Sequence, residues 1–457
     1  MRNIENAFWT VANSDPHAAA SFDRLHTSGG MESDHLWPEI QRTIEDIGRN
    51  AMGKVDAQMA RLPRWRDLNH FDAVMKVHFT DGRKYEDISK LVIFAAHNVL
   101  TEQASPEGYL LLRCLRCFVE HDMHVSFEQH TEQTVASGHA WLMKFSRTIS
   151  KYKAAFPAKN WNFPKFGYSL HAYFDIEDKG VTANYNTKTS EKRHSPFKMT
   201  AKTSINNKNV EPQLLKVEDR LLIAVNMREN LRIWDEQNRP TPDEDDQPYL
   251  KEFQFNHVYL GSRQKPSTLA TLKFEKSNDP AFDKFSTRLT DFVNSTLRQH
   301  GLRPIVFRSS DTITECRYLK ITFESLVTWA PLTDYLRCSP SFHGHIRNDG
   351  IIIDIGGGQS LFAQLIFIFF CDVGLQEHTP IALVWPMDRP IGPRSRKDQH
   401  LGLLRLRARP RSECMLISVK SIIRGAMLVD AYDRPDNFFA VDVVDTDMYV
   451  RLKAIFR

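Results

Sequence analysis

Apolar residues recur at helical spacing through the first half of the chain, and this pattern predicts four long helices. They are expected over residues 38–62, 85–100, 106–128 and 131–155. Ser105 and Pro106 suit the start of the third helix, as capping residue and first-turn proline. The pattern therefore predicts an all-α block over residues 36–158 after an irregular stretch at 1–35. A further helix is expected over residues 211–234.

The period changes to two in the second half, as is typical of strands. Residues 249–275 alternate like a hairpin, 280–300 look helical, and short apolar runs follow at 351–354, 361–371, 381–385 and 438–444. The run at 361–371 is about half the length that spans a bilayer, so we expect a buried strand. Gly356, Gly357 and Gly358 suit a hairpin turn.

These elements predict an α+β protein with several domains. The strand-rich carboxy-terminal domain, residues 249–457, is expected to be a small barrel of SH3-like type or a sandwich. The acidic, proline-containing segment 235–248 reads as a linker. Residues 159–234, between the all-α block and the linker, form a segment with its own motifs.

Composition narrows the function classes. The 457 residues are 42% hydrophobic and 25% charged, which is typical of a folded protein of two to four domains. The net charge of +4 means that any basic surface must come from local clustering. Six cysteines and the absence of a signal-peptide pattern favour an intracellular protein. Without a P-loop, a Rossmann glycine pattern or a serine-hydrolase elbow, we expect no nucleotide cofactor.

Two groups of basic residues are candidates for contact with phosphates. The first surrounds Glu191 and consists of Lys188, Lys192, Arg193, His194 and Lys198. A carboxylate among cations suits metal-assisted chemistry on a nucleic-acid backbone, and such a run is also typical of a solvated helix. In the second group, Arg405, Arg407 and Arg409 alternate with apolar residues, so on a strand they would share one face. That row suits a phosphate backbone and equally suits a charged edge strand.

Four potential zinc ligands, Cys114, Cys117, His121 and His124, occur within eleven residues. On a single helix the outer two would lie about 15 Å apart along the axis. They could not close one tetrahedron, although a neighbouring pair could share a metal with ligands from elsewhere.

Three phrases, taken in order, resemble the Plavaka transposases of fungi, which belong to the CACTA (En/Spm-like) group. They are Leu62–His70, then Asn162–Lys165 followed by His171, then Asn184–Lys198. The resemblance covers about residues 14–234, and the second half is similar to the strand-rich tail of many such proteins. These enzymes cut and paste DNA with an RNase H-like core. Three acids of a DDE pattern in that core hold two divalent ions, Mg²⁺ or Mn²⁺.

The resemblance implies roles for individual residues. Glu191 would be the final acid and a metal ligand, and Asp23 and His26 would be the Asp-x-x-His signature before the helical insertion at 36–158. Lys198 would meet DNA phosphate. One departure is Gly167, which stands where the family often has a histidine.

A second departure concerns the first two catalytic aspartates, which the family places before that signature. Only 22 residues precede Asp23 here, too few for a sheet of several strands. The resemblance therefore implies the carboxy-terminal part of a transposase, in which a metal pair is not held.

The function implied is a nuclear, transposase-derived DNA-binding protein that recognises transposon ends. Its activity as an enzyme is left open, a homo-oligomer is compatible with this reading, and no membrane partner is expected. The alternative is a non-enzymatic DNA- or chromatin-binding module that uses the basic carboxy-terminal domain.

Overall fold

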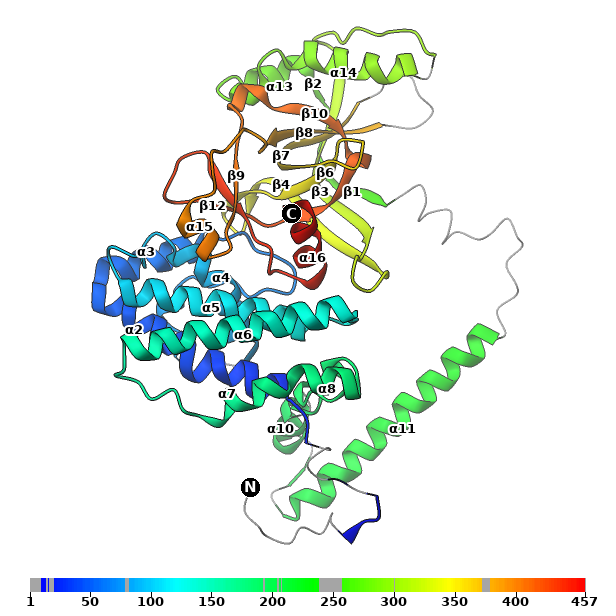
Figure 1. The fold of residues 1–457 in the computed structure, drawn as a ribbon. Helices are drawn as coiled ribbons and strands as arrows, with labels where there is room; N and C mark the ends of the chain where they lie inside the picture. The colour runs from blue at the N-terminus through cyan, green and yellow to red at the C-terminus, as the bar shows by residue number, and fades with distance from the viewer. Residues whose placement is uncertain are drawn as a thin grey trace.

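The computed structural model describes residues 10–13, 15, 20–78, 82–191, 194–203, 205–206, 208–237, 257–299, 301–371 and 379–456. The amino-terminal half is helical and the carboxy-terminal half is strand-rich, which confirms the mixed architecture predicted from the sequence (Figure 1). The expected linker falls mainly outside the described residues, from 238 onward. No described helix is both long enough and apolar enough to cross a bilayer.

Helices in the first half follow the predicted ranges closely. They are α2 (Trp37–Ile47), α3 (Arg49–Ala60), α4 (Gly82–Ala96), α5 (Pro106–Val125), α6 (Glu132–Ala155), α7 (Pro164–Tyr168), α8 (Ala172–Lys179), α9 (Lys188–Glu191), α10 (His194–Thr203) and α11 (Val210–Gln237). The single helix expected at 38–62 is broken at Gly48, whose φ of 117° glycine adopts without steric cost. The irregular stretch expected at 1–35 is partly wrong, because Leu25–Gly29 and Glu32–Leu36 are π-helical.

The described strands of the second half form two antiparallel sheets. They are β1 (Val258–Arg263), β2 (Ser267–Thr268), β3 (Thr312–Glu324), β4 (Pro331–Phe342), β5 (His345–Asn348), β6 (Gly350–Asp354), β7 (Ser360–Cys371), β8 (Thr379–Pro386), β9 (Leu404–Arg407), β10 (Met415–Ser418), β11 (Ile422–Ala426), β12 (Leu428–Asp430) and β13 (Asn437–Ala440). The larger sheet runs β10-β8-β7-β3-β4-β5, with β6 paired to β7, β11 paired to β6, and β1 and β2 on β3, and it curves into a half-barrel. The smaller sheet runs β12-β13-β9.

The expected hairpin at 249–275 is wrong in its pairing. Strand β1 pairs with β3, and the chain after β2 turns into helix α13 (Leu269–Glu275). Helices α14 (Phe285–Gln299), α15 (Arg396–His400) and α16 (Thr446–Ile455) complete this half. The predicted glycine turn is confirmed, because β6 and β7 pair on either side of Gly356, Gly357 and Gly358, which all have positive φ.

Strand β7 is apolar throughout because both of its faces are covered. Leu365 and Ile368 belong to a core that continues into the helical half, whereas Phe367 and Phe369 pack in a second core with α14. A strand buried on two sides reads as a continuous apolar run and loses its alternation. This confirms the buried strand predicted at 361–371.

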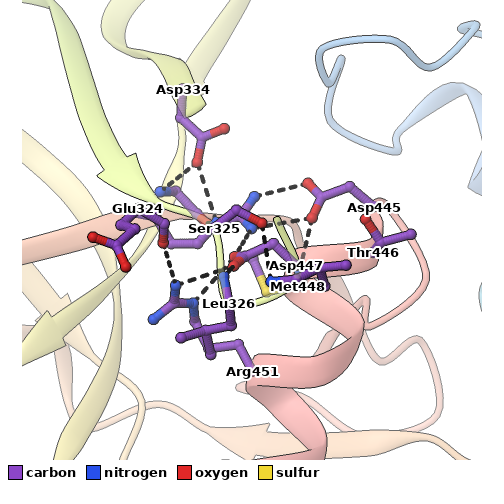
Figure 2. Close-up of polar contacts among 12 residues, drawn as sticks. Glu324, Ser325, Leu326, Asp334, Asp445, Thr446, Asp447, Met448 and Arg451 are labelled. Atoms are coloured by element: carbon purple, nitrogen blue, oxygen red, sulfur yellow. Dashed lines mark hydrogen bonds and ion pairs between the residues drawn. The ribbon is translucent and has the colours of Figure 1, made fainter. Parts of the chain in front are cut away.

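The helical and strand-rich halves share one hydrophobic core and are also joined by buried ion pairs between side chains. Arg116 of α5 contacts Glu120 and reaches Asp442 near the carboxy terminus, with Nη1 3.0 Å from Oδ1. Around α16, Asp445 and Asp447 lie at the start of the helix, close to Asp334 of β4 (Figure 2). Their common partner is the buried Arg424, whose Nη2 lies 2.8 Å from Oδ2 of Asp445.

Candidate functional site

Residues of the Asp-x-x-His signature and of the segment Asn184–Lys198 lie close together in the helical half. Asp23 accepts hydrogen bonds from the Thr187 backbone nitrogen at 3.2 Å and from its hydroxyl at 2.6 Å, across 164 residues of sequence. The His26 ring contacts Asp23 through Nδ1, and its Nε2 lies 3.9 Å from Oε1 of Glu191. The structure therefore brings together Asp23, His26 and Glu191, the three residues that the resemblance singled out as catalytic.

The segment that carries Asp23 is anchored by the buried side chain of the preceding residue, Phe22. Phe22 is buried in a small core with Val125, Leu142 and Tyr173. Its backbone nitrogen donates to Oδ2 of Asp175 at 2.7 Å. The π-helix at Leu25–Gly29 follows directly and includes His26. Single π-helical turns are frequent at functional sites, because they displace side chains from the regular helical positions.

Glu86 of α4 ties the two motif segments to the same point. Its Oε1 lies 3.0 Å from Nη2 of Arg24, next to Asp23, and its Oε2 lies 3.5 Å from Nζ of Lys188, next to Thr187. Lys90 makes a third contact at 2.9 Å. Burial alone would raise the pKa of Glu86, but Arg24, Lys90 and Lys188 hold it well below its usual value. Glu86 is therefore ionised and fixes both segments.

The carboxylates in and around the site have pKa values shifted in opposite directions. Burial, together with the charges of Asp122 and Glu86, raises the pKa of Glu32 well above its usual value. The exposed rim behaves differently. Burial opposes ionisation of Asp23, but hydrogen bonds from Thr187 and His26 lower its pKa below the usual value. Asp23 is therefore ionised at neutral pH, and its carboxylate contacts the His26 ring.

The described donor groups at this site, a histidine and two carboxylates, differ from the all-oxygen ligand set that Mg²⁺ prefers. Within the described ranges, no group of three or more His, Cys, Asp or Glu side chains is placed to hold a metal. The Asp23 carboxylate is directed to Thr187 and His26, and Oε1 of Glu191 lies 3.9 Å from Nε2 of the His26 ring. Magnesium needs near-octahedral oxygen ligands, and a histidine between two carboxylates does not supply them.

The four zinc candidates have other contacts. Cys114 is buried and burial raises the pKa of its thiol, while Cys117 lies beside the Thr148 hydroxyl. His121 Nδ1 lies 2.8 Å from the Tyr173 hydroxyl, and His124 Nδ1 lies 2.7 Å from the Glu120 carbonyl oxygen. Cys117, His121 and His124 thus have partners within the protein, and Cys114 packs in the hydrophobic core.

Two exposed lysines lie on α10, the helix that follows Glu191 in the sequence. Lys198 and Lys202 are both exposed and, four residues apart, lie on one face of this helix. His194 is the first residue of α10. Lys188 is engaged by Glu86, and the predicted Lys192 and Arg193 lie outside the described residues. His171, expected from the resemblance, is exposed at the end of a short 3₁₀ turn before α8.

The arginine row of the second half is arranged differently. Arg405 is buried, and its guanidinium lies 2.7 Å from Asp398 and 3.0 Å from Asp433. Strand β9 ends at Arg407, whose backbone forms an isolated β-bridge with Asp388, and Arg409 donates from Nε to Asp388 at 2.6 Å. Arg405 and Arg409 thus have carboxylate partners within the chain, which reduces the positive charge available to an external phosphate.

Sequence reasoning missed Glu86 and Thr187. Thr187 lies within the segment Asn184–Lys198, but the sequence predicted no role for it. Nothing in its sequence separation from Asp23 indicates that the two residues are in contact. Glu86 lies in the amphipathic pattern of α4, where a glutamate is ordinary. The chain itself matches no family model, no curated protein and no solved structure.

Proposed function

We propose that this chain is a DNA-binding protein of transposase descent, in which Asp23, His26 and Glu191 mark the remnant of a DDE site on an RNase H-like core. The observation that supports it is the contact across the site. The resemblance requires the Asp-x-x-His segment and the final acid to meet, although more than 160 residues separate them, and Asp23 and Thr187 are in contact. The helical insertion between them contributes Glu86 of α4 to the site, and Val125 of α5 packs against Phe22 beside it.

DNA would lie along α10. Lys198 and Lys202 offer two exposed cations on one helix face, and phosphate contacts of this kind give sequence-independent affinity. The ionised carboxylates of Asp23 and Glu86 would repel the phosphates, so the DNA backbone would not lie directly over these two residues. In this arrangement the two lysines bind phosphates, and the carboxylates of Asp23 and Glu86 determine the path of the DNA backbone beside them.

Salt-dependent DNA binding tests the proposal. Fluorescence anisotropy with a labelled duplex should show an affinity that falls linearly with the logarithm of salt concentration. The double variant Lys198→Glu, Lys202→Glu should flatten that slope by about 2, close to one per lost phosphate contact. The matched control is Lys265→Glu with Lys273→Glu, two exposed lysines in the second half, with the same change in net charge. Equal effects of both pairs, or no binding at low salt, would contradict the proposal.

Catalysis is tested separately with Mg²⁺ or Mn²⁺ and labelled DNA. Because the described donors differ from the ligand set that Mg²⁺ prefers, we expect binding without cleavage, and we expect Glu191→Gln to bind as the parent does. Cleavage that disappears in Glu191→Gln would show that the site still holds catalytic ions.

The alternative places DNA or chromatin on the carboxy-terminal half. It predicts that Arg407→Glu with Arg409→Glu abolishes binding, whereas our proposal predicts little change. The ion pair of Arg409 with Asp388 favours the α10 surface.

A further inference from the structure

Helix α11 leaves a large apolar surface uncovered. Its 28 residues extend about 42 Å, and beyond its start, where it packs against α10, it stands away from the other elements that the structure describes (Figure 1). Leu221, Val225, Met227 and Leu231 are between 52% and 63% exposed. Leu215, Leu222 and Ile233 of α11 are exposed as well, and contiguous exposed apolar surface of this kind marks an interaction site.

A coiled-coil seam runs along one face of this helix. The a positions are Leu214, Leu221, Arg228 and Asp235, and the d positions are Val210, Val217, Ala224 and Leu231. Alternate steps of three and four residues are the pattern by which two helices pack side by side. Leu214 and Val217 are half-buried at the end where α10 packs, so the open part of the seam runs from Leu221 to Leu231.

Two observations favour a second copy of this chain as the partner on that seam. The helix carries charges of both signs, so two copies do not repel each other along their length. The open seam is also complementary to itself when reversed, as an interface with two-fold symmetry requires.

The position of Arg228 selects the antiparallel direction. In a parallel pair the two Arg228 guanidinium groups would face each other inside the seam, which costs electrostatic energy. In an antiparallel pair centred near Asn226, Leu221 faces the second copy's Leu231, and Arg228 faces the small Ala224. Val225 and Met227 then meet their own copies beside the two-fold axis. Every open seam residue gains a partner of fitting size.

We propose that α11 pairs antiparallel with α11 of a second copy, so that the chain is a homodimer. The inference does not depend on the proposed function. The first test is the mass of the full chain by light scattering and sedimentation across the micromolar range, where we expect a dimer. A monomer at every concentration would overturn the proposal and leave the surface to a different partner.

Two variants of the same charge change separate the seam from the rest of the helix. Leu221→Glu places a carboxylate in the open seam and should weaken the dimer roughly a hundredfold or more. Asn226→Glu adds the same charge to the outward face and should leave the dimer intact. Circular dichroism checks that both variants keep the helical content of the parent. Equal effects of the two variants would overturn the assignment of the seam.

Cysteine cross-linking tests the direction. The native cysteines are all buried, so background reaction is low. Leu221→Cys and Leu231→Cys should each fail to form a disulfide dimer alone and should form one when the two proteins are mixed. Disulfide formation by Leu221→Cys alone would show a parallel pair and refute the antiparallel arrangement.

Discussion

Arg116 offers the sharpest test of how the two halves of the chain are joined. It is 1% exposed and lies between Glu120 of its own helix and Asp442 from the other end of the sequence. Replacing it with methionine keeps most of the side-chain volume and removes the charge. Two buried carboxylates then lose a cation, although Lys453 still contacts both of them.

The structure sets the size of the effect. Burial would raise the pKa of Glu120, but Arg116 and then Lys453 hold it at about 2 instead of its usual 4.5. That depression corresponds to roughly 3 kcal/mol of stability at neutral pH, shared among the partners of Glu120. Removing one member of a buried ion pair costs about 3–5 kcal/mol in other proteins. We therefore expect Arg116→Met to lose about 3 kcal/mol at pH 7.

The pH dependence gives an independent check. A depressed pKa of Glu120 stabilises the parent above the unfolded value of 4.5, and this contribution is lost as the pH falls toward 2. In Arg116→Met the pKa of Glu120 rises, so the carboxyl takes up a proton at mild acidity and the uncompensated charge disappears. The stability difference between parent and variant should therefore narrow from pH 7 to pH 4.

Urea unfolding followed by circular dichroism and tryptophan fluorescence measures the difference. Arg113→Met, one turn earlier on α5, is the control, because Arg113 is only half-buried and makes no ion pair with the described residues. Coincident transitions in both signals are expected, since the halves share one core. A loss no larger than that of Arg113→Met, or a difference that stays constant down to pH 4, would refute the reasoning.

Three further predictions concern the helical half. Gly138→Ala places a Cβ 2.4 Å from the Tyr173 hydroxyl and should cost about 1–3 kcal/mol in urea unfolding, whereas Gly53→Ala, with open space around it, should not destabilise. Burial lowers the pKa of His121 to about 4, so protonation of the unfolded chain should erode stability from about pH 6.5 down to pH 4; His121→Gln should flatten this part of the stability profile, and an unchanged profile would contradict it. Glu86→Gln should speed amide hydrogen exchange in residues 23–29 and 187–191, because one carboxylate anchors both segments; the exposed Glu102→Gln is the control, and equal exchange in both variants would count against that anchor.

The sequence alone determined the class of each region and most element types. The positions of α5 and α6 follow from apolar residues every three or four positions, because that spacing puts one helix face into a core. The glycine turn before β7 and the buried character of β7 followed from local composition in the same way. The resemblance also pointed to Asp23, His26 and Glu191 before any contact between them was visible.

Only the tertiary structure decided which distant residues meet. The contact of Asp23 with Thr187, the anchoring role of Glu86 and the pairing of Arg116 with Asp442 all join segments that no local pattern connects. Strand β1 pairs with β3 for the same reason, because a strand's partner is chosen by packing and register over the whole sheet. A period of apolar residues shows that a face will be buried, whereas the partner that covers it emerges only when the chain has folded.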